Sequence, residues 1–161
     1  MKSFVLGVHP SSRGFGWVLF DSPVSALDWG APHPSRDKHG ECLARLTRLL
    51  AQYRPVAVAL EQFDGDASRR APRIRTLATA MVDVVQDRGI EVAVYPRKHI
   101  VRTLKQPDTA TRQDVAEQVA RTIVHLRSHL PPPRKLWEGE HSKLPIFSAA
   151  ACALTWYAQC G

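Results

Sequence analysis

Two histidines and several carboxylates stand at the ends of predicted strands or in loops, and these residue types together can hold a divalent metal ion. His9 follows one apolar run and Glu61 ends another, while Asp64, Glu140 and His141 lie in predicted loops. Because strand ends meet at one edge of an α/β sheet, we expect His9 and Glu61 to lie close together. A ligand set that mixes imidazole with carboxylate favours manganese, zinc or another nitrogen-tolerant ion over magnesium.

Each of these residues also has a structural explanation that needs no ligand. His9 can cap the turn after its strand by hydrogen bonding to one of the two serines that follow Pro10. Glu61 can pair with a nearby arginine, and the acidic residues on either side of Gly65 are typical of turns. The pair at 140–141 is equally consistent with exposure to solvent. The residue types alone therefore leave a metal site and a structural role open.

The sequence contains no independent sign of nucleophilic or nucleotide chemistry. Its three cysteines, Cys42, Cys152 and Cys160, have no metal-ligand spacing, and the first two fall on apolar faces of predicted helices. No combination of serine, histidine and aspartate stands out, and no glycine-rich phosphate loop is present. We expect the two cysteines on apolar faces to be small core residues.

Short apolar runs and helical periodicity divide the 161-residue chain into alternating elements. The apolar runs predict five strands, over 4–8, 16–20, 26–30, 56–60 and 91–95. Apolar residues at helical spacing predict four helices, over 41–53, 73–87, 111–130 and 147–159. A meander of three strands followed by strand–helix–strand units predicts an α/β fold, with a mixed five-stranded sheet and helices on both faces. We expect a single domain over 1–161.

Basic residues outnumber acidic ones by 22 to 15, and the formal net charge of +7 favours an anionic partner. The candidate nucleic-acid-binding residues cluster beside predicted strand ends and in the last loop: Arg69, Arg70, Arg73, Arg97, Lys98, Arg112 and Lys135. Arginine and lysine contacts to phosphate position a nucleic acid without reading its sequence. The clusters therefore predict a nucleic-acid interface, with branched or duplex DNA as the expected partner. Trp137 lies beside Lys135 and can either stack on an exposed base or cover the core; we favour the core.

The chain lacks the sequence features of a membrane or secreted protein. No apolar stretch is long enough to span a bilayer, and residues 1–8 do not have the pattern of a secretory signal. We therefore expect the protein to act in the cytoplasm.

Four segments, in the right order and over nearly the whole chain, resemble the signatures of the RuvC-type Holliday-junction resolvases, which have a ribonuclease H-like fold. The family's opening strand and turn resemble residues 5–16, VLGVHPSSRGFG, and its second signature resembles residues 58–62, VALEQ. Its lysine-bearing third segment resembles the Tyr-Pro pair at 95–96 with the basic residues after it and the helix start at 109–119. Its last helix resembles residues 148–156, SAAACALTW.

The resemblance implies a nuclease site in which four carboxylates hold two magnesium ions for hydrolysis of a phosphodiester. At the corresponding positions this chain has His9, Glu61, Pro145 and Ser148, so that only Glu61 matches in type. The resemblance makes His9, Glu61 and Ser148 the candidate catalytic residues. It also places Arg112 in the region of the family's lysine.

Two hypotheses follow for this site. In the first, His9 and Glu61 are joined by nearby carboxylates such as Asp64, Asp66 or Glu140, with or without His141, and the rebuilt site binds Mg²⁺ or Mn²⁺ and cuts branched DNA. In the second, cleavage is weak or lost, and the chain is a RuvC-like nucleic-acid-binding protein with a degenerate metal site. We favour the second, because a single glutamate cannot hold two divalent ions.

The resemblance further implies a homodimer that acts on a two-fold DNA junction. We expect the partner surface on the helix that carries Met81 and Val85, although the same apolar stripe is also typical of a core face.

Overall fold

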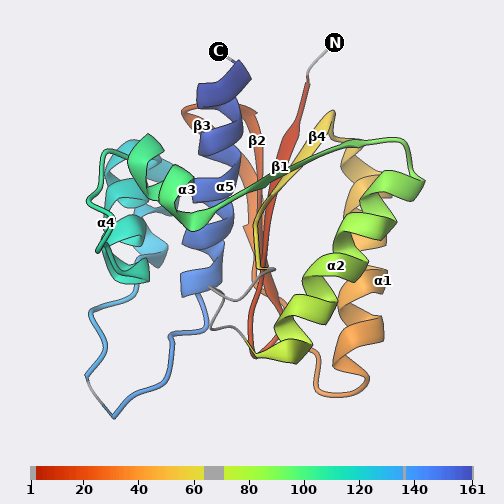
Figure 1. Cartoon of the computed structure of the whole chain (residues 1–161), viewed down its shortest axis with the longest axis horizontal. Coiled ribbons are helices and arrows are strands. Elements are labelled where there is room, and N and C mark those ends of the chain that lie inside the picture. Colours follow the sequence, from red (N-terminus) through yellow and green to blue (C-terminus); the bar gives the residue numbers. More distant parts are fainter. Residues whose placement is uncertain (1–2, 64–70, 136, 161) are drawn as a thin grey trace.

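The computed structural model describes residues 3–63, 71–135 and 137–160, whose helices and strands are shown in Figure 1. The strands are β1 (Val5–Pro10), β2 (Phe15–Ser22), β3 (Ser25–Gly30), β4 (Ala57–Glu61) and β5 (Glu91–Tyr95). The helices are α1 (Lys38–Tyr53), α2 (Pro72–Asp87), α3 (Arg97–Thr103), α4 (Arg112–Thr122), the 3-10 helix η1 (Val124–His129) and α5 (Leu144–Cys160). Each predicted strand is present close to its expected bounds.

The strands form one mixed sheet in the order β3-β2-β1-β4-β5. β1, β2 and β3 form the antiparallel meander, while β4 and β5 run parallel to β1. In the two parallel ladders Gly7 faces Ala59 and Glu61 faces Tyr95. The predicted fold class is therefore confirmed, and the C-terminal ends of β1, β4 and β5 lie at the same edge of the sheet.

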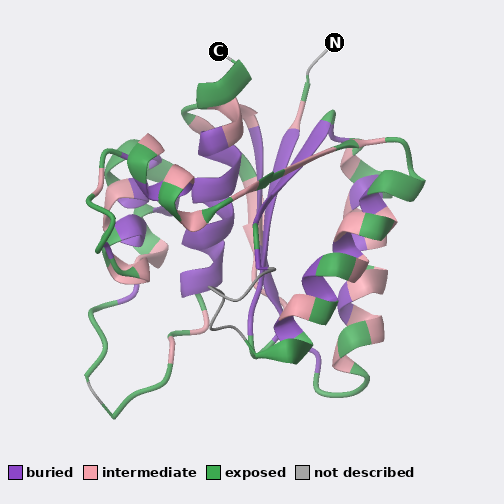
Figure 2. Cartoon of the chain, viewed as in Figure 1, coloured by how far each residue is buried: buried purple, intermediate pink, exposed green. Residues whose placement is uncertain are grey.

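Helices cover both faces of this sheet. α1 and α2 lie on one face, and α3, α4 and α5 lie on the other (Figure 1). The strands and the sheet-facing sides of the helices hold most of the buried residues (Figure 2). Because successive strand side chains point to opposite faces, Leu6 joins the core under α1 and α2, whereas Val5 joins the core under α5.

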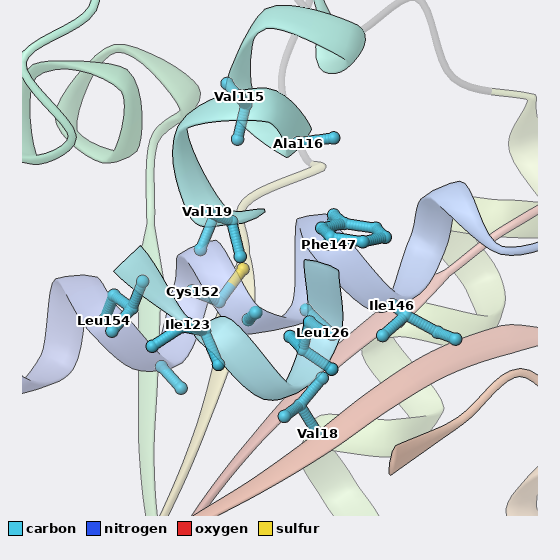
Figure 3. Close-up of a cluster of buried hydrophobic side chains, with 14 of the residues drawn as sticks. Val18, Val115, Ala116, Val119, Ile123, Leu126, Ile146, Phe147, Cys152 and Leu154 are labelled. Atoms are coloured by element: carbon cyan, nitrogen blue, oxygen red, sulfur yellow. The ribbon is translucent and has the colours of Figure 1, made fainter. Parts of the chain in front are cut away.

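Two cores hold the layers together. On one face, Val18 of β2, Val119 of α4 and Phe147 of α5 are fully buried (Figure 3). On the other face, Leu46 of α1 and Met81 of α2 are fully buried against β1 and β4. Each buried side chain of this size contributes about 1.5–3 kcal/mol of hydrophobic free energy.

α5 lies directly against β1 and β2 because two glycines leave room for its backbone. A Cβ atom at Gly7 would lie 2.0 Å from the carbonyl oxygen of Ala149, and a Cβ atom at Gly16 would lie 2.4 Å from that of Pro145. Gly16 also faces His9 in the β1–β2 ladder. The two close approaches therefore hold the start of α5 beside the C-terminal end of β1.

The long helix predicted before the three prolines is wrong in its second half. The chain leaves the α-helix at Ile123, which has φ −107° and ψ 93°, and continues as η1. The Arg127 guanidinium donates to the carbonyl oxygen of Ala120 at 3.1 Å, which satisfies an acceptor near the end of α4. Ile123 and Leu126 remain fully buried, so the apolar spacing that predicted a continuous helix persists through the break.

Two further features differ from the sequence-based expectation. α3 was not predicted, and it turns the basic segment after β5 into a short helix that packs on α5. The expected partner surface on α2 is wrong for Met81 and Val85, because both are fully buried in the chain's own core. Within the described residues, no helix is long and apolar enough to cross a membrane.

Candidate functional site

Four charged or polar side chains from four elements meet at the C-terminal edge of the parallel strands. His9 lies near the end of β1 and Glu61 ends β4, while Arg97 and Arg112 are the first residues of α3 and α4. His9 is fully buried, and the side chain of Glu61 is 8% exposed. The expected convergence of His9 and Glu61 on one edge therefore occurs, with two arginines added. We call these four residues the edge cluster.

Both oxygens of the Glu61 carboxylate face guanidinium groups in the edge cluster. Arg97 Nη1 lies 3.9 Å from Glu61 Oε1, and Arg112 Nη2 lies 3.6 Å from Glu61 Oε2. Arg97 also donates to the carbonyl oxygen of Ala110 at 2.8 Å, which orients its side chain. The ion pair with arginine that the sequence left open for Glu61 is present in the structure.

His9 is tied to the same cluster through Arg112. The two groups meet at 3.1 Å between Arg112 Nη1 and His9 Nε2. A guanidinium can only donate, so Nε2 must accept, and the ring proton of the neutral imidazole is on Nδ1. The ring also makes an edge contact with Phe63, at 5.4 Å between ring centroids.

The edge cluster contains two guanidinium groups and one carboxylate, and therefore has an excess of one positive charge. Burial lowers the pKa of Arg97, the nearby charge of Arg112 lowers it further, and Glu61 partly opposes both effects. The side chains of Arg97 and Arg112 are still 36% and 23% exposed. The cluster is thus accessible to a ligand, and its charge favours an anion.

The other predicted site residues lie around this edge in different settings. Ser148 is buried in α5, next to the residue whose carbonyl faces Gly7. Glu140 and His141 line a cleft of about 750 Å³ beside Arg112 at the start of α4. Asp64, Asp66, Arg69 and Arg70 lie outside the described residues. Among the residues that are described, no group of three or more histidine, cysteine, aspartate or glutamate side chains could hold a metal ion.

A second group of cations surrounds the turn between β1 and β2, and only one of its members was predicted. Lys38 Nζ and Arg73 Nη2 both donate to the carbonyl oxygen of Ser12, at 3.1 and 3.0 Å, and Arg13 is the next residue. Within the described part of the chain, none of these three cations has a carboxylate within ion-pair distance. We call Arg13, Lys38 and Arg73 the turn cluster.

The electrostatic effect of the turn cluster reaches His33. Burial lowers the pKa of His33, and the charges of Arg13 and Lys38 lower it further. Sequence reasoning missed Arg13 and Lys38 because neither belongs to a run of basic residues. Lys38 and Arg73 lie 26 and 61 residues beyond Ser12 in the chain. Only the proximity of α1 and α2 to the turn brings these two side chains to Arg13.

The expectation that Trp137 covers the core is wrong. Its side chain is 80% exposed in the loop between η1 and α5, and Lys135 Nζ lies 5.4 Å from the ring centroid. Lys98 and Lys135, which were predicted to bind nucleic acid, are exposed as well.

No protein-family model matches the sequence, and no curated protein matches it significantly. Solved structures match along nearly the whole chain. RuvC from Thermus thermophilus has a TM-score of 0.69 at 21% identity, over 98% of this chain and 96% of that one. This chain has a RuvC-like fold. The same RuvC in complex with a Holliday junction substrate gives a TM-score of 0.68, with the same identity and coverage.

Two other resolvases share the RuvC-like architecture. The fowlpox virus resolvase, solved in complex with Holliday junction DNA, has a TM-score of 0.56 at 14% identity, over 96% of this chain and 99% of that one. The yeast mitochondrial Holliday junction resolvase Ydc2 has a TM-score of 0.57 at 14% identity, over 98% of this chain and 80% of that one.

Among the described residues, the donors at this edge of the sheet do not fit the two-magnesium site that the resemblance implies. Magnesium requires oxygen ligands in octahedral geometry, and two ions usually need several carboxylates. Both Glu61 oxygens are paired with arginine, His9 Nε2 accepts from Arg112, and Ser148 has no charge. The two nearby guanidinium groups would also repel a divalent cation.

Proposed function

We propose that this RuvC-like protein binds nucleic acid at the C-terminal edge of its sheet and that metal-dependent cleavage there is weak or lost. The observation that carries the proposal is the pairing of Glu61 with both Arg97 and Arg112. Branched DNA is the favoured partner, because two of the structures similar to this chain contain Holliday junctions.

The chemistry of the edge cluster supports an anionic ligand. Arginine presents a planar fork of donors that matches the oxygens of a phosphate and remains charged even when partly buried. Arg97 and Arg112 hold their guanidinium groups close to one carboxylate, and one positive charge remains uncompensated. A phosphodiester that approaches the edge can balance that charge without a bridging metal ion.

The turn cluster supplies a second contact for the same backbone. Arg13, Lys38 and Arg73 lie around the turn after β1, whose last residues include His9 of the edge cluster. Cations spaced along one edge can contact successive phosphates, and each contact adds to the salt dependence of binding. Exposed Lys98 and Lys135 extend the basic surface to α3 and the last loop.

We further infer a homodimer, since a four-way junction offers two equivalent sites. Light scattering on the free protein and on its complex with a junction measures this stoichiometry. One chain per junction at saturation would contradict the dimer and leave nucleic-acid binding intact.

The central test uses a labelled four-way DNA junction and a duplex of matched length. Wild type, Glu61→Gln and the control Glu41→Gln are compared in EDTA, Mg²⁺ and Mn²⁺. Glu41 lies on α1 and pairs with Arg45, so its substitution removes the same charge outside the edge cluster. We expect a shifted band in all three buffers and no cleavage. Cleavage by wild type that disappears only in Glu61→Gln would refute the proposal and establish a working metal site.

A further inference from the structure

Trp137 is the most exposed large apolar side chain among the described residues, at 80%. Tryptophan rings are usually well buried, because their large apolar area gains much free energy from leaving water. A ring left in solvent is therefore an efficient anchor for a partner that covers it. Its neighbours indicate which kind of partner that is.

The loop that carries Trp137 is attached to the domain at both ends and projects from it in between (Figure 1). At its start, Gln113 Nε2 donates to the carbonyl oxygen of Pro131 at 2.9 Å. At its end, the Lys143 amide donates to His141 Nδ1 at 3.1 Å and forms a turn within the loop, directly before α5 begins. Three consecutive prolines, 131–133, stiffen the first part of the loop. The protein thus presents the ring on a supported projection.

One cation lies against the exposed ring, and others lie along the same loop. Lys135 Nζ lies 5.4 Å from the ring centroid in a cation–π contact, and Arg134 is exposed beside it. On the return path of the loop, a Cβ atom at Gly139 would lie 4.0 Å from Arg13 Nη2 of the turn cluster. Glu138 is the opposing charge next to the ring. The loop therefore places an aromatic surface near the turn cluster, which we propose contacts phosphates.

We propose that Trp137 stacks on an unpaired nucleobase, while Lys135 and the turn cluster hold the phosphates of the same strand. This inference rests on the proposed nucleic-acid binding and specifies the part of the nucleic acid that is recognised. Base–aromatic stacking tolerates any base, because every base has a π face. A base within a duplex has both faces covered by its neighbours, so stacking requires a gap, a single strand or a branch point.

The test uses the full-length protein and three labelled DNAs: a duplex, the same duplex with a short single-stranded gap, and an oligo-dT strand. Each is titrated with wild type, Trp137→Ala and Trp137→Phe, and tryptophan fluorescence is followed in parallel. We expect Trp137→Ala to weaken binding to the gapped and oligo-dT probes by about 5- to 100-fold and to leave duplex binding unchanged. Trp137→Phe, which keeps an aromatic face, should retain most of the wild-type affinity.

The possible failures are distinguishable. Wild-type protein that binds neither these three DNAs nor the four-way junction of the central test would refute the proposed function itself, whereas binding to the junction alone would refute the stacking. Wild-type binding to all of them, with no selective loss in Trp137→Ala, would refute the stacking while leaving nucleic-acid binding intact. A uniform loss on all probes would also overturn it, because stacking cannot affect a closed duplex. A thermal melt checks that the exposed substitution leaves the fold unchanged.

Discussion

The pairing of Glu61 with two arginines predicts that Glu61→Gln tightens nucleic-acid binding. The amide keeps the size of the side chain and one acceptor oxygen, but the edge cluster loses its single negative charge. Its excess charge rises from one to two, because Arg97 and Arg112 remain. A catalytic metal ligand would behave in the opposite way, since its loss would weaken any DNA contact made through the metal.

The size of the effect follows from Coulomb's law. A carboxylate and a phosphate on opposite sides of one guanidinium are roughly 6–8 Å apart, and their repulsion at an effective dielectric constant of about 20–40 is roughly 1–3 kcal/mol. Screening and partial exposure of both arginines favour the lower half of that range. We therefore expect binding to tighten by roughly 5- to 30-fold at low salt. The substitution should lower the free energy of unfolding by only about 1 kcal/mol, because water can hydrate the partly exposed arginines once the carboxylate is gone.

Fluorescence polarisation with a labelled junction, in EDTA and in Mg²⁺ at several salt concentrations, measures the change in affinity. Glu41→Gln raises the net charge of the protein equally and serves as the control. Similar tightening in both variants would show a general charge effect and remove the special role of the edge cluster. Weaker binding by Glu61→Gln would refute the reasoning, because it would mean that the carboxylate supports the ligand.

Other predictions follow from the close packing and the turn cluster. Gly7→Ala should lower the free energy of unfolding by about 3 kcal/mol, because its Cβ atom would overlap a carbonyl group of α5. Gly89→Ala should lower it by only about 1 kcal/mol, because Gly89 has φ +72° but open space around it. A denaturant melt that ranks the two variants the other way would contradict the packing. Arg13→Ala should reduce the salt slope of DNA binding by about one, and Arg88→Ala, at the opposite end of α2, should not. In the same Arg13→Ala variant the pKa of His33 should rise toward its ordinary value, because one of the charges that lower it is gone; an unchanged NMR titration would place Arg13 elsewhere.

Most of the fold could be predicted because its apolar pattern reports burial directly. The residues of β1 and β4 are buried throughout, as expected for inner strands with neighbours on both sides. In α1 the buried residues Cys42, Leu46 and Leu50 recur every four positions, the spacing of one buried helix face. The break at Ile123 could not be predicted in this way, because α- and 3-10 helices bury similar positions over so few residues. The stabilising contact there comes from Arg127, which the apolar pattern does not include.

The candidate site could be predicted in part. The convergence of His9 and Glu61 could be predicted, because each is a polar residue at or near the end of an apolar strand. Parallel strands bring such ends to the same edge of the sheet. The role of Arg112 did not follow, because its contact with His9 joins residues 103 positions apart. Likewise, a tryptophan beside lysine is compatible with core or surface, and only the path of the loop leaves Trp137 in solvent.

The sequence alone determined the order of the elements, the class of the sheet and the basic character of the chain, since these depend on local periodicity and composition. The tertiary structure alone decided the chemistry of the edge. It brings Arg97 and Arg112 onto the one carboxylate at the end of β4, and it gathers Arg13, Lys38 and Arg73 around one turn. Charge–charge energies depend on distances through space, and separation along the chain says little about those distances.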